Sequence, residues 1–135
     1  MEWSLHPQLA KLTTVVGDLA LSRVLLENDS SYPWLILVPR MPGISEIIDL
    51  DPNEQVQLLG EIDAASRALK SVATFEKLNI AALGNMVKQL HVHEIGRSST
   101  DATWPKPVWG LTPPVPYEPA AREKLLDALR QALKM

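Results

Sequence analysis

The segment 88–97 constrains the fold most, because its polar and apolar residues alternate. Alternation with a period of two predicts a β-strand, and successive side chains of a strand point to opposite faces. Gln89, His91 and His93 should therefore share one face, while Leu90 shares the other with its apolar neighbours. Such a strand can anchor one face in a core and present two imidazole rings on the other.

Two neighbouring imidazoles permit metal binding or nucleophilic catalysis. Imidazole is the commonest metal ligand, but a site needs a third ligand. The sequence has no cysteine, and its one other histidine, His6, is far away near the N-terminus. Glu94 should point to the opposite face, so we expect no metal and no cofactor. A neutral imidazole can instead attack phosphorus or an acyl carbon while a second imidazole donates a proton. A packing role for both rings is the third interpretation.

The residues around this strand resemble the signature of the histidine triad (HIT) superfamily. That signature is His, apolar, His, apolar, His and two apolar residues, after a glycine turn. In the segment 84–95, Gly84 matches the turn, and His91 and His93 match the second and third histidines. Gln89 replaces the first histidine, as in a bacterial branch that the chain resembles.

The resemblance extends to both sides of this segment. Residues 32–40 look like the family's buried strand that ends in proline and a basic residue, and residues 104–110 look like a tail of the bacterial branch. The match covers about residues 17–110. A Pro- and Trp-rich tail that starts at Trp104 should continue into residues 111–135, which should also hold a C-terminal helix. We therefore expect a single HIT-like domain over residues 1–135.

The resemblance implies an α+β fold with a mainly antiparallel sheet of about five strands, one long helix and a C-terminal helix. The residues themselves predict strands at 19–27, 34–38 and 77–83. The run 34–38 is apolar throughout, so we expect it to be central, with both faces covered. Residues 5–14 should form a short helix, followed by a turn at Gly17.

The long helix should begin after Asp51. Asp is a good N-cap, Pro52 suits the first helical position, and Glu54 completes a capping-box pattern. We expect Glu61 on the solvent side. The apolar residues that recur near helical spacing should face the core: Val56, Leu59, Ile62, Leu69 and Val72.

The resemblance also implies an activity. It points to a nucleotide-binding hydrolase or transferase that acts on the α-phosphoryl group of a nucleoside phosphoramidate or another small nucleotide conjugate. By the same resemblance, His91 is the nucleophile, His93 contacts phosphate or the leaving group, and Gln89 completes the catalytic set by orienting its neighbours. The departures at Gln89, Met86 and Glu94 leave open a nucleotide-binding module with weak catalysis.

Further residues are expected near the nucleotide by the same resemblance. Asn79 and Asn85 are candidate donors to the phosphate. Gly84 suits a positive φ or a close approach of the backbone to an anion. Asn28 matches a polar residue near the ribose, and Asp29 is its alternative.

Composition excludes some partners and leaves others open. A net charge of −3 provides no basic field for a nucleic acid polymer. No apolar run approaches the roughly 18 residues of a membrane span, and no signal-peptide pattern is present, so we expect a cytoplasmic protein. The resemblance implies a small nucleotide substrate and a homodimer. The tail should pack on the domain or on a second subunit, or Trp104 or Trp109 could wall the active site.

Overall fold

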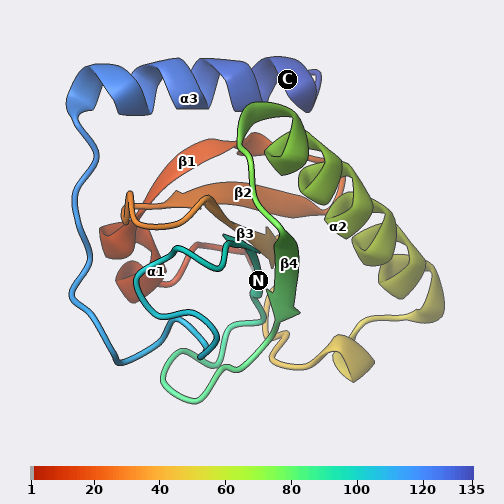
Figure 1. Ribbon diagram of the computed structural model, residues 1–135. Coiled ribbons are helices and arrows are strands. Elements are labelled where there is room, and N and C mark those ends of the chain that lie inside the picture. The colour runs from red at the N-terminus through yellow and green to blue at the C-terminus, as the bar shows by residue number, and fades with distance from the viewer. Residues whose placement is uncertain (1) are drawn as a thin grey trace.

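Five β-strands form one sheet in the computed structural model, which describes residues 2–135. The order across the sheet is β1-β2-β3-β5-β4, and every neighbouring pair is antiparallel (Figure 1). The strands are β1 (Thr13–Asp18), β2 (Ser22–Glu27), β3 (Trp34–Pro39), β4 (Lys77–Ala81) and β5 (Val92–Arg97). The predicted α+β fold and its mainly antiparallel sheet are confirmed, with β3 central as expected.

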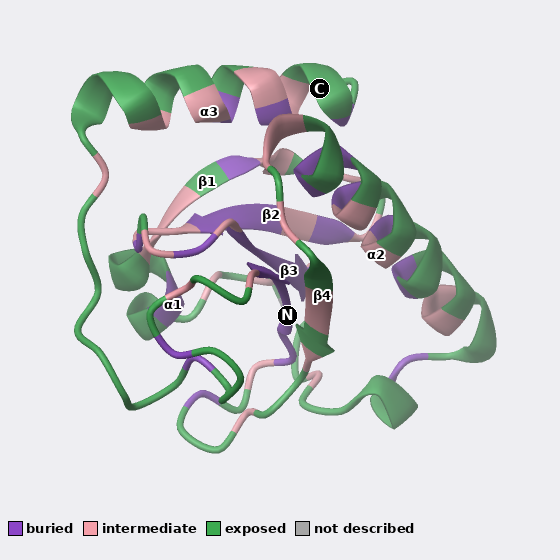
Figure 2. Cartoon of the chain, in the orientation of Figure 1, coloured by how far each residue is buried: buried purple, intermediate pink, exposed green. Residues whose placement is uncertain are grey.

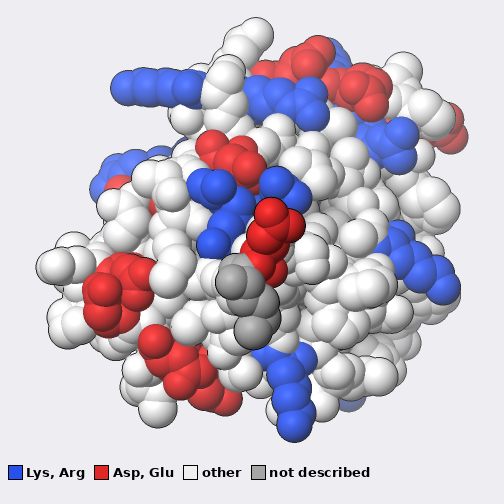
Figure 3. All heavy atoms as spheres, turned by 180° about the vertical axis from the view of Figure 1, so that it is seen from behind, with Lys and Arg blue, Asp and Glu red and all other residues white. Residues whose placement is uncertain are grey.

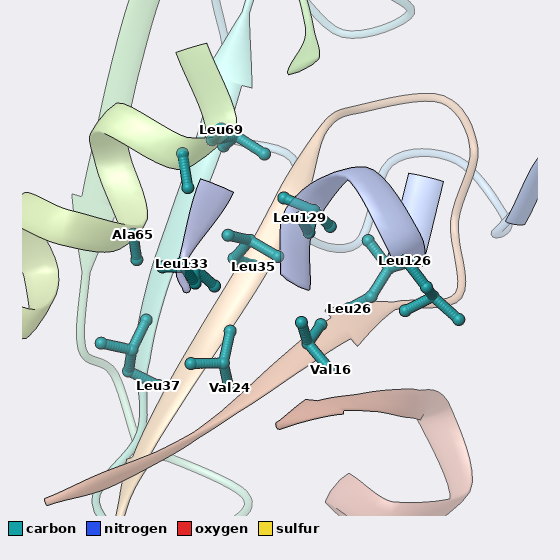
Figure 4. Packing of buried hydrophobic residues seen from close by; sticks show 11 residues of the cluster. Val16, Val24, Leu26, Leu35, Leu37, Ala65, Leu69, Leu126, Leu129 and Leu133 are labelled. Carbon is teal, nitrogen blue, oxygen red and sulfur yellow. The ribbon is translucent and has the colours of Figure 1, made fainter. Parts of the chain in front are cut away.

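Two long helices cover one face of the sheet and a short one packs on the other. The helices are α1 (Pro7–Leu12), α2 (Pro52–Val72) and α3 (Pro119–Ala132), with a 3₁₀ turn, η1 (Ile47–Asp49). On the face of α2 and α3, apolar side chains of helices and strands meet in the larger core cluster (Figure 4), which includes Val16, Val24, Leu26, Leu35, Leu37, Leu69, Leu126 and Leu129. On the other face, Leu9 of α1 joins Trp34, Ile36 and Ile95. Within residues 2–135, none of the helices combines the length and apolar character that crossing a bilayer requires.

The start of α2 confirms the predicted capping box. The side chain of Asp51 accepts from the Glu54 N–H at 2.8 Å, and the Glu54 side chain accepts from the Asp51 N–H at 2.8 Å. Pro52 occupies the first turn. These contacts satisfy backbone donors that a helix start leaves without partners.

The predicted core stripe of α2 was partly wrong. Val56 and Leu59 are 73% and 67% exposed, whereas Glu61, expected on the solvent side, is only 4% exposed. Glu61 is buried because its carboxylate accepts from the N–H groups of Leu21 and Ser22, at 2.8 and 2.9 Å. A carboxylate with both oxygens hydrogen-bonded can occupy a core position that an unpaired one cannot.

Two strand boundaries also differ from the prediction. Gly17, expected in a turn, lies inside β1, where the register shifts between Val15 and Gly17. The strand predicted over 88–97 begins only at Val92, which pairs with Leu37 of β3. The ladder stops there because β3 ends at Pro39, which has no N–H to donate. His91 therefore immediately precedes β5.

The alternation of side chains along β5 is as predicted. Glu94 faces α2, where its carboxyl group accepts from the Ser66 hydroxyl at 3.0 Å. His93 and Ile95 face the other way, toward Trp34. All of β5 is buried, as is its neighbour β3, which Figure 2 shows in purple. The two imidazoles, one in β5 and one just before it, therefore have a rigid support.

Candidate functional site

The candidate site is a pair of imidazole rings at the start of β5. The ring centroids of His91 and His93 are 4.9 Å apart and the ring planes meet at 70°. Each residue is 7% exposed. The sheet thus brings the two rings together on the face that α2 and α3 leave free.

The hydrogen bond of His91 fixes its tautomer. Its Nδ1 lies 2.7 Å from the carbonyl oxygen of Gln89. A carbonyl oxygen only accepts, so Nδ1 carries the hydrogen. In the neutral ring, Nε2 of His91 therefore has a free lone pair, as a nucleophile requires.

The hydrogen bond of His93 fixes the opposite tautomer. The indole Nε1–H of Trp34 donates to His93 Nδ1 at 3.1 Å. An indole N–H only donates, so the hydrogen of His93 is on Nε2. Burial, with a smaller contribution from His91, lowers the pKa of His93 to about 3, and the ring is neutral near pH 7. One ring offers a lone pair and the other offers an N–H donor.

An apolar cavity of about 350 Å³ opens beside the two rings. We call it the apolar cavity, because most of the residues that line it are apolar: Leu9, Leu12, Trp34, Ile36, Leu83, Met86, Val87 and Trp109. Among the described residues of the wall, Glu27 is the one ionisable group besides the histidines. Burial, with a smaller contribution from Asp29, raises the pKa of Glu27 to about 7.

His91 also borders a second hollow. This second hollow has a volume of about 260 Å³ and is lined by residues 45–48, 82–84 and 89–91. Gly84 borders both hollows. His91, which carries the free Nε2, thus borders both the apolar cavity and the second hollow. Each of them is large enough for part of a small molecule.

The turn residues predicted near the phosphate do lie beside the histidines. Gly84 has a φ of +75°, as expected for a turn that favours glycine. Gly84 and Asn85 both line the apolar cavity. Met86, which follows them, also lines the cavity and is 95% exposed.

Two predicted asparagines do not line either space. Asn79 accepts from the Arg97 guanidinium at 3.1 Å, and Asn28 accepts from the Thr14 hydroxyl at 2.8 Å. The alternative to Asn28, Asp29, accepts from the Val115 N–H at 3.1 Å and so holds the tail. All three serve contacts within the protein.

The side chain of Gln89 bonds to the N-terminal segment and not to either imidazole. Its Oε1 accepts from the His6 N–H and its Nε2 donates to the Ser4 carbonyl, both at 2.9 Å. Of the residues predicted from the triad pattern, the structure therefore brings together His91 and His93, but not the amide of Gln89. His6, the third histidine, caps α1 by accepting from the Gln8 N–H.

The tail places one of its two candidate tryptophans at the site. The ring of Trp109 lies 5.0 Å from that of His93, edge to face. Trp104 instead lies over the guanidinium of Arg97, at 5.9 Å. Val108, between them, is buried in the smaller core cluster. The tail therefore packs on the domain and also walls the cavity.

Sequence reasoning missed Trp34 and Glu27 as site residues. Trp34 was predicted only as part of a buried strand, because its contact with His93 depends on the β3–β5 register, which pairs Ile36 with His93. Glu27 immediately precedes Asn28 and Asp29, where a ribose contact was predicted. The sequence did contain one indication of its role, because Glu27 is a carboxyl residue that directly follows the apolar residues of β2.

Across residues 2–135, no three His, Asp or Glu side chains converge as a metal ion would require. Glu94 lies on the opposite face of β5, as the alternation predicted.

Comparisons with known proteins agree with this geometry. Residues 9–100 match the family model described as HIT domain. A histidine triad protein from Bradyrhizobium japonicum is 51% identical, with a TM-score of 0.96 over 98% of this chain and 99% of that one. One from Marinobacter aquaeolei VT8 is 44% identical, with a TM-score of 0.95 over 99% and 98%. One from Sinorhizobium meliloti 1021 is 37% identical, with a TM-score of 0.93 over 96% of each chain. A search of curated proteins finds no match.

Proposed function

The chain belongs to the HIT domain family, and on that premise we propose that it acts on the α-phosphoryl group of a small nucleotide conjugate. A nucleoside phosphoramidate is the substrate class we favour, with hydrolysis or nucleotidyl transfer as the reaction. The observation that carries the proposal is the pair of opposite tautomers, a lone pair on His91 Nε2 beside an N–H on His93 Nε2.

The proposed reaction has two displacement steps. His91 Nε2 forms a bond to phosphorus, and the bond to the leaving group breaks with its electron pair on the leaving group, which takes up a proton. Water or another acceptor then attacks phosphorus and releases His91. The His93 Nε2–H donates to a phosphoryl oxygen in both steps. A donor already in place stabilises developing charge without reorganisation.

The apolar cavity suits the nucleoside. Trp109 and the aliphatic wall offer contact to a base, and the carboxyl group of Glu27 offers an acceptor for ribose hydroxyls. Gly84 and Asn85 line the same cavity, and we assign their backbone and amide N–H groups to the phosphoryl oxygens. We leave Asn79 and Asn28 out of the proposed site, because their side chains already serve Arg97 and Thr14.

Turnover of an adenosine phosphoramidate tests the proposal. We expect His91→Ala to lose at least about 10³-fold in kcat/KM, since the variant has no nucleophile. Circular dichroism would verify that the variant is folded. Wild-type protein that turns over a panel of nucleotide conjugates no faster than His91→Ala would contradict the proposed activity.

A nucleotide-binding module with weak catalysis is the second candidate. It is favoured by Met86, a departure from the family's pattern, which is 95% exposed at the rim of the apolar cavity. Calorimetry with AMP and GMP separates the two candidates. Binding without turnover of any conjugate supports the module, and turnover that depends on His91 supports the enzyme.

We also propose a homodimer as the working form. Val56 and Leu59 leave an exposed apolar strip on α2, and β4 is an edge strand of the sheet. A second copy would cover apolar surface that is otherwise in water.

We propose further that Gln89 marks a bacterial branch of the family. A cytoplasmic location remains a prediction, which cell fractionation would check.

A nucleic acid polymer does not fit the proposal. On the face seen in Figure 3, the acidic and basic side chains of the described residues are interspersed. With a net charge of −3, this surface lacks the basic stripe that polymer binding uses. The proposed partner is a single nucleotide unit.

A further inference from the structure

The amide of Gln89 connects two segments that are far apart in the sequence. Both of its polar atoms bond to the N-terminal segment, Oε1 to the His6 N–H and Nε2 to the Ser4 carbonyl, at 2.9 Å each. A two-point contact fixes the orientation of the segment as well as its position.

The segment that Gln89 holds leads directly into a wall of the apolar cavity. His6 is the N-cap of α1, and its ring accepts from the Gln8 N–H at 3.0 Å. Gln8, Leu9 and Leu12 of α1 line the cavity. Leu9 is buried against Trp34 and Val87. The position of the cavity wall therefore depends on the cap residue to which Gln89 bonds.

The backbone of the same residue holds the proposed nucleophile. The Gln89 carbonyl oxygen is the partner of His91 Nδ1, at 2.7 Å. Residue 89 thus bonds through its side chain to the segment that leads into the cavity wall, and through its main chain to His91. Neither contact places its amide on the reacting phosphoryl group.

We propose that Gln89 is a positioning residue, which fastens residues 4–6 so that α1 closes the apolar cavity beside His91. The inference rests on the proposed nucleotide-conjugate activity for its kinetic consequence. It assigns the first position of the triad pattern a role in substrate binding and not in the displacement. Gln89 would therefore affect the affinity for the nucleoside, whose base and ribose would occupy the cavity.

Gln89→Met tests the inference, because Met keeps the length of the side chain and removes both hydrogen bonds. Gln131→Met, on the exposed side of α3, is the matched control. Three quantities are measured: amide exchange of residues 2–12, the KM and kcat for an adenosine phosphoramidate, and the Kd for AMP.

We expect exchange in α1 to become about ten-fold faster in Gln89→Met, since two hydrogen bonds of ordinary strength are lost. KM and the AMP Kd should rise about three- to ten-fold, because the preformed wall is lost, while kcat stays within about two-fold. Gln131→Met should match wild type in all three. A fall in kcat with unchanged exchange and KM would overturn the inference and place Gln89 on the reacting atoms. No change in any quantity would overturn it as well.

The proposed activity can fail separately from this inference. If His91→Ala is as active as wild type, the proposed function is wrong. The exchange rates and the AMP Kd still decide whether Gln89 fastens the cavity wall.

Discussion

At the scale of single residues, the site depends on two fixed tautomers. Gln89 offers a carbonyl acceptor to His91, and Trp34 offers an N–H donor to His93. The carbonyl oxygen can only accept and the indole N–H can only donate, so neither ring can change its tautomer without losing its hydrogen bond. Because burial keeps His93 neutral, its Nε2–H is available as a donor across the physiological pH range.

Trp34→Phe isolates the indole donor. Phe keeps an aromatic ring in the core and leaves His93 Nδ1 free to take a proton. We expect the pKa of His93 to rise above its value of about 3, and kcat to fall by about ten-fold as the ring reorients. NMR titration of the imidazole and steady-state kinetics measure the two effects. Trp104→Phe, over Arg97 and away from the rings, is the control. An unchanged imidazole titration and kcat in Trp34→Phe would count against this role.

Glu94 makes stability depend on pH. Burial, opposed by the Ser66 hydrogen bond, raises its pKa from 4.5 to about 8. The folded state therefore binds more protons than the unfolded state between these values, and the free energy of unfolding should fall as pH rises from about 4.5 to about 8. The slope from one group is at most about 1.4 kcal/mol per pH unit.

Urea unfolding at several pH values measures this dependence. Glu94→Gln keeps an acceptor for Ser66 but does not titrate, so its stability should depend less on pH than that of wild type. Glu123→Gln, which is exposed on α3, should retain the wild-type dependence. Parallel curves for wild type and Glu94→Gln would contradict the role of Glu94.

At the scale of elements, short sequence patterns correctly predicted the features that depend on neighbouring residues alone. The cap at Asp51 and the opposite directions of His93 and Glu94 follow from spacing along one segment, and both are confirmed. The contact between Trp34 and His93 spans 59 positions and depends on strand register. No short pattern specifies that register, so the tautomer partner could not be predicted.

The errors have the same physical origin. Glu61 is buried because it accepts hydrogen bonds from the β1–β2 turn, 39 and 40 positions away. The helical spacing of apolar residues cannot show such a contact, so a carboxylate between them is predicted to face solvent. The strand predicted over 88–97 begins only at Val92, because the ladder with β3 ends there. The amide of Gln89 bonds to the N-terminal segment.

Glu61→Ala should destabilise the fold by about 2–4 kcal/mol. Both N–H groups of the β1–β2 turn lose a charged acceptor, and the Ser22 N–H is left buried. Asp63→Ala removes an exposed pair with Arg67 on the same helix and should cost less than about 1 kcal/mol. Urea unfolding compares the two, and equal losses would contradict the anchoring role of Glu61.

At the scale of the whole molecule, α3 completes the same core that α2 begins. Leu126 and Leu129 pack with Ala65 and Leu69, and the tail that leads to α3 contributes Trp109 to the cavity. We therefore propose that the tail and α3 belong to one domain with the sheet, as the sequence predicted. The exposed strip on α2 is the part of this surface that the proposed dimer would use.

Leu59→Glu tests the dimer. A charge in the middle of an apolar interface cannot be paired and should weaken association by at least about ten-fold. Analytical ultracentrifugation measures the dissociation constant. Gln131→Glu adds the same charge on α3 and should leave it unchanged. A wild-type protein that sediments as a monomer, or a Leu59→Glu dimer of unchanged affinity, would contradict this interface.

The most direct test of the central claim is to trap the covalent intermediate. Protein that is turning over an adenosine phosphoramidate would be quenched rapidly and mapped by peptide mass spectrometry. We predict an adenylyl group on the imidazole of His91, the ring whose Nε2 is free. A group bonded to His93 or to any other residue would contradict the account.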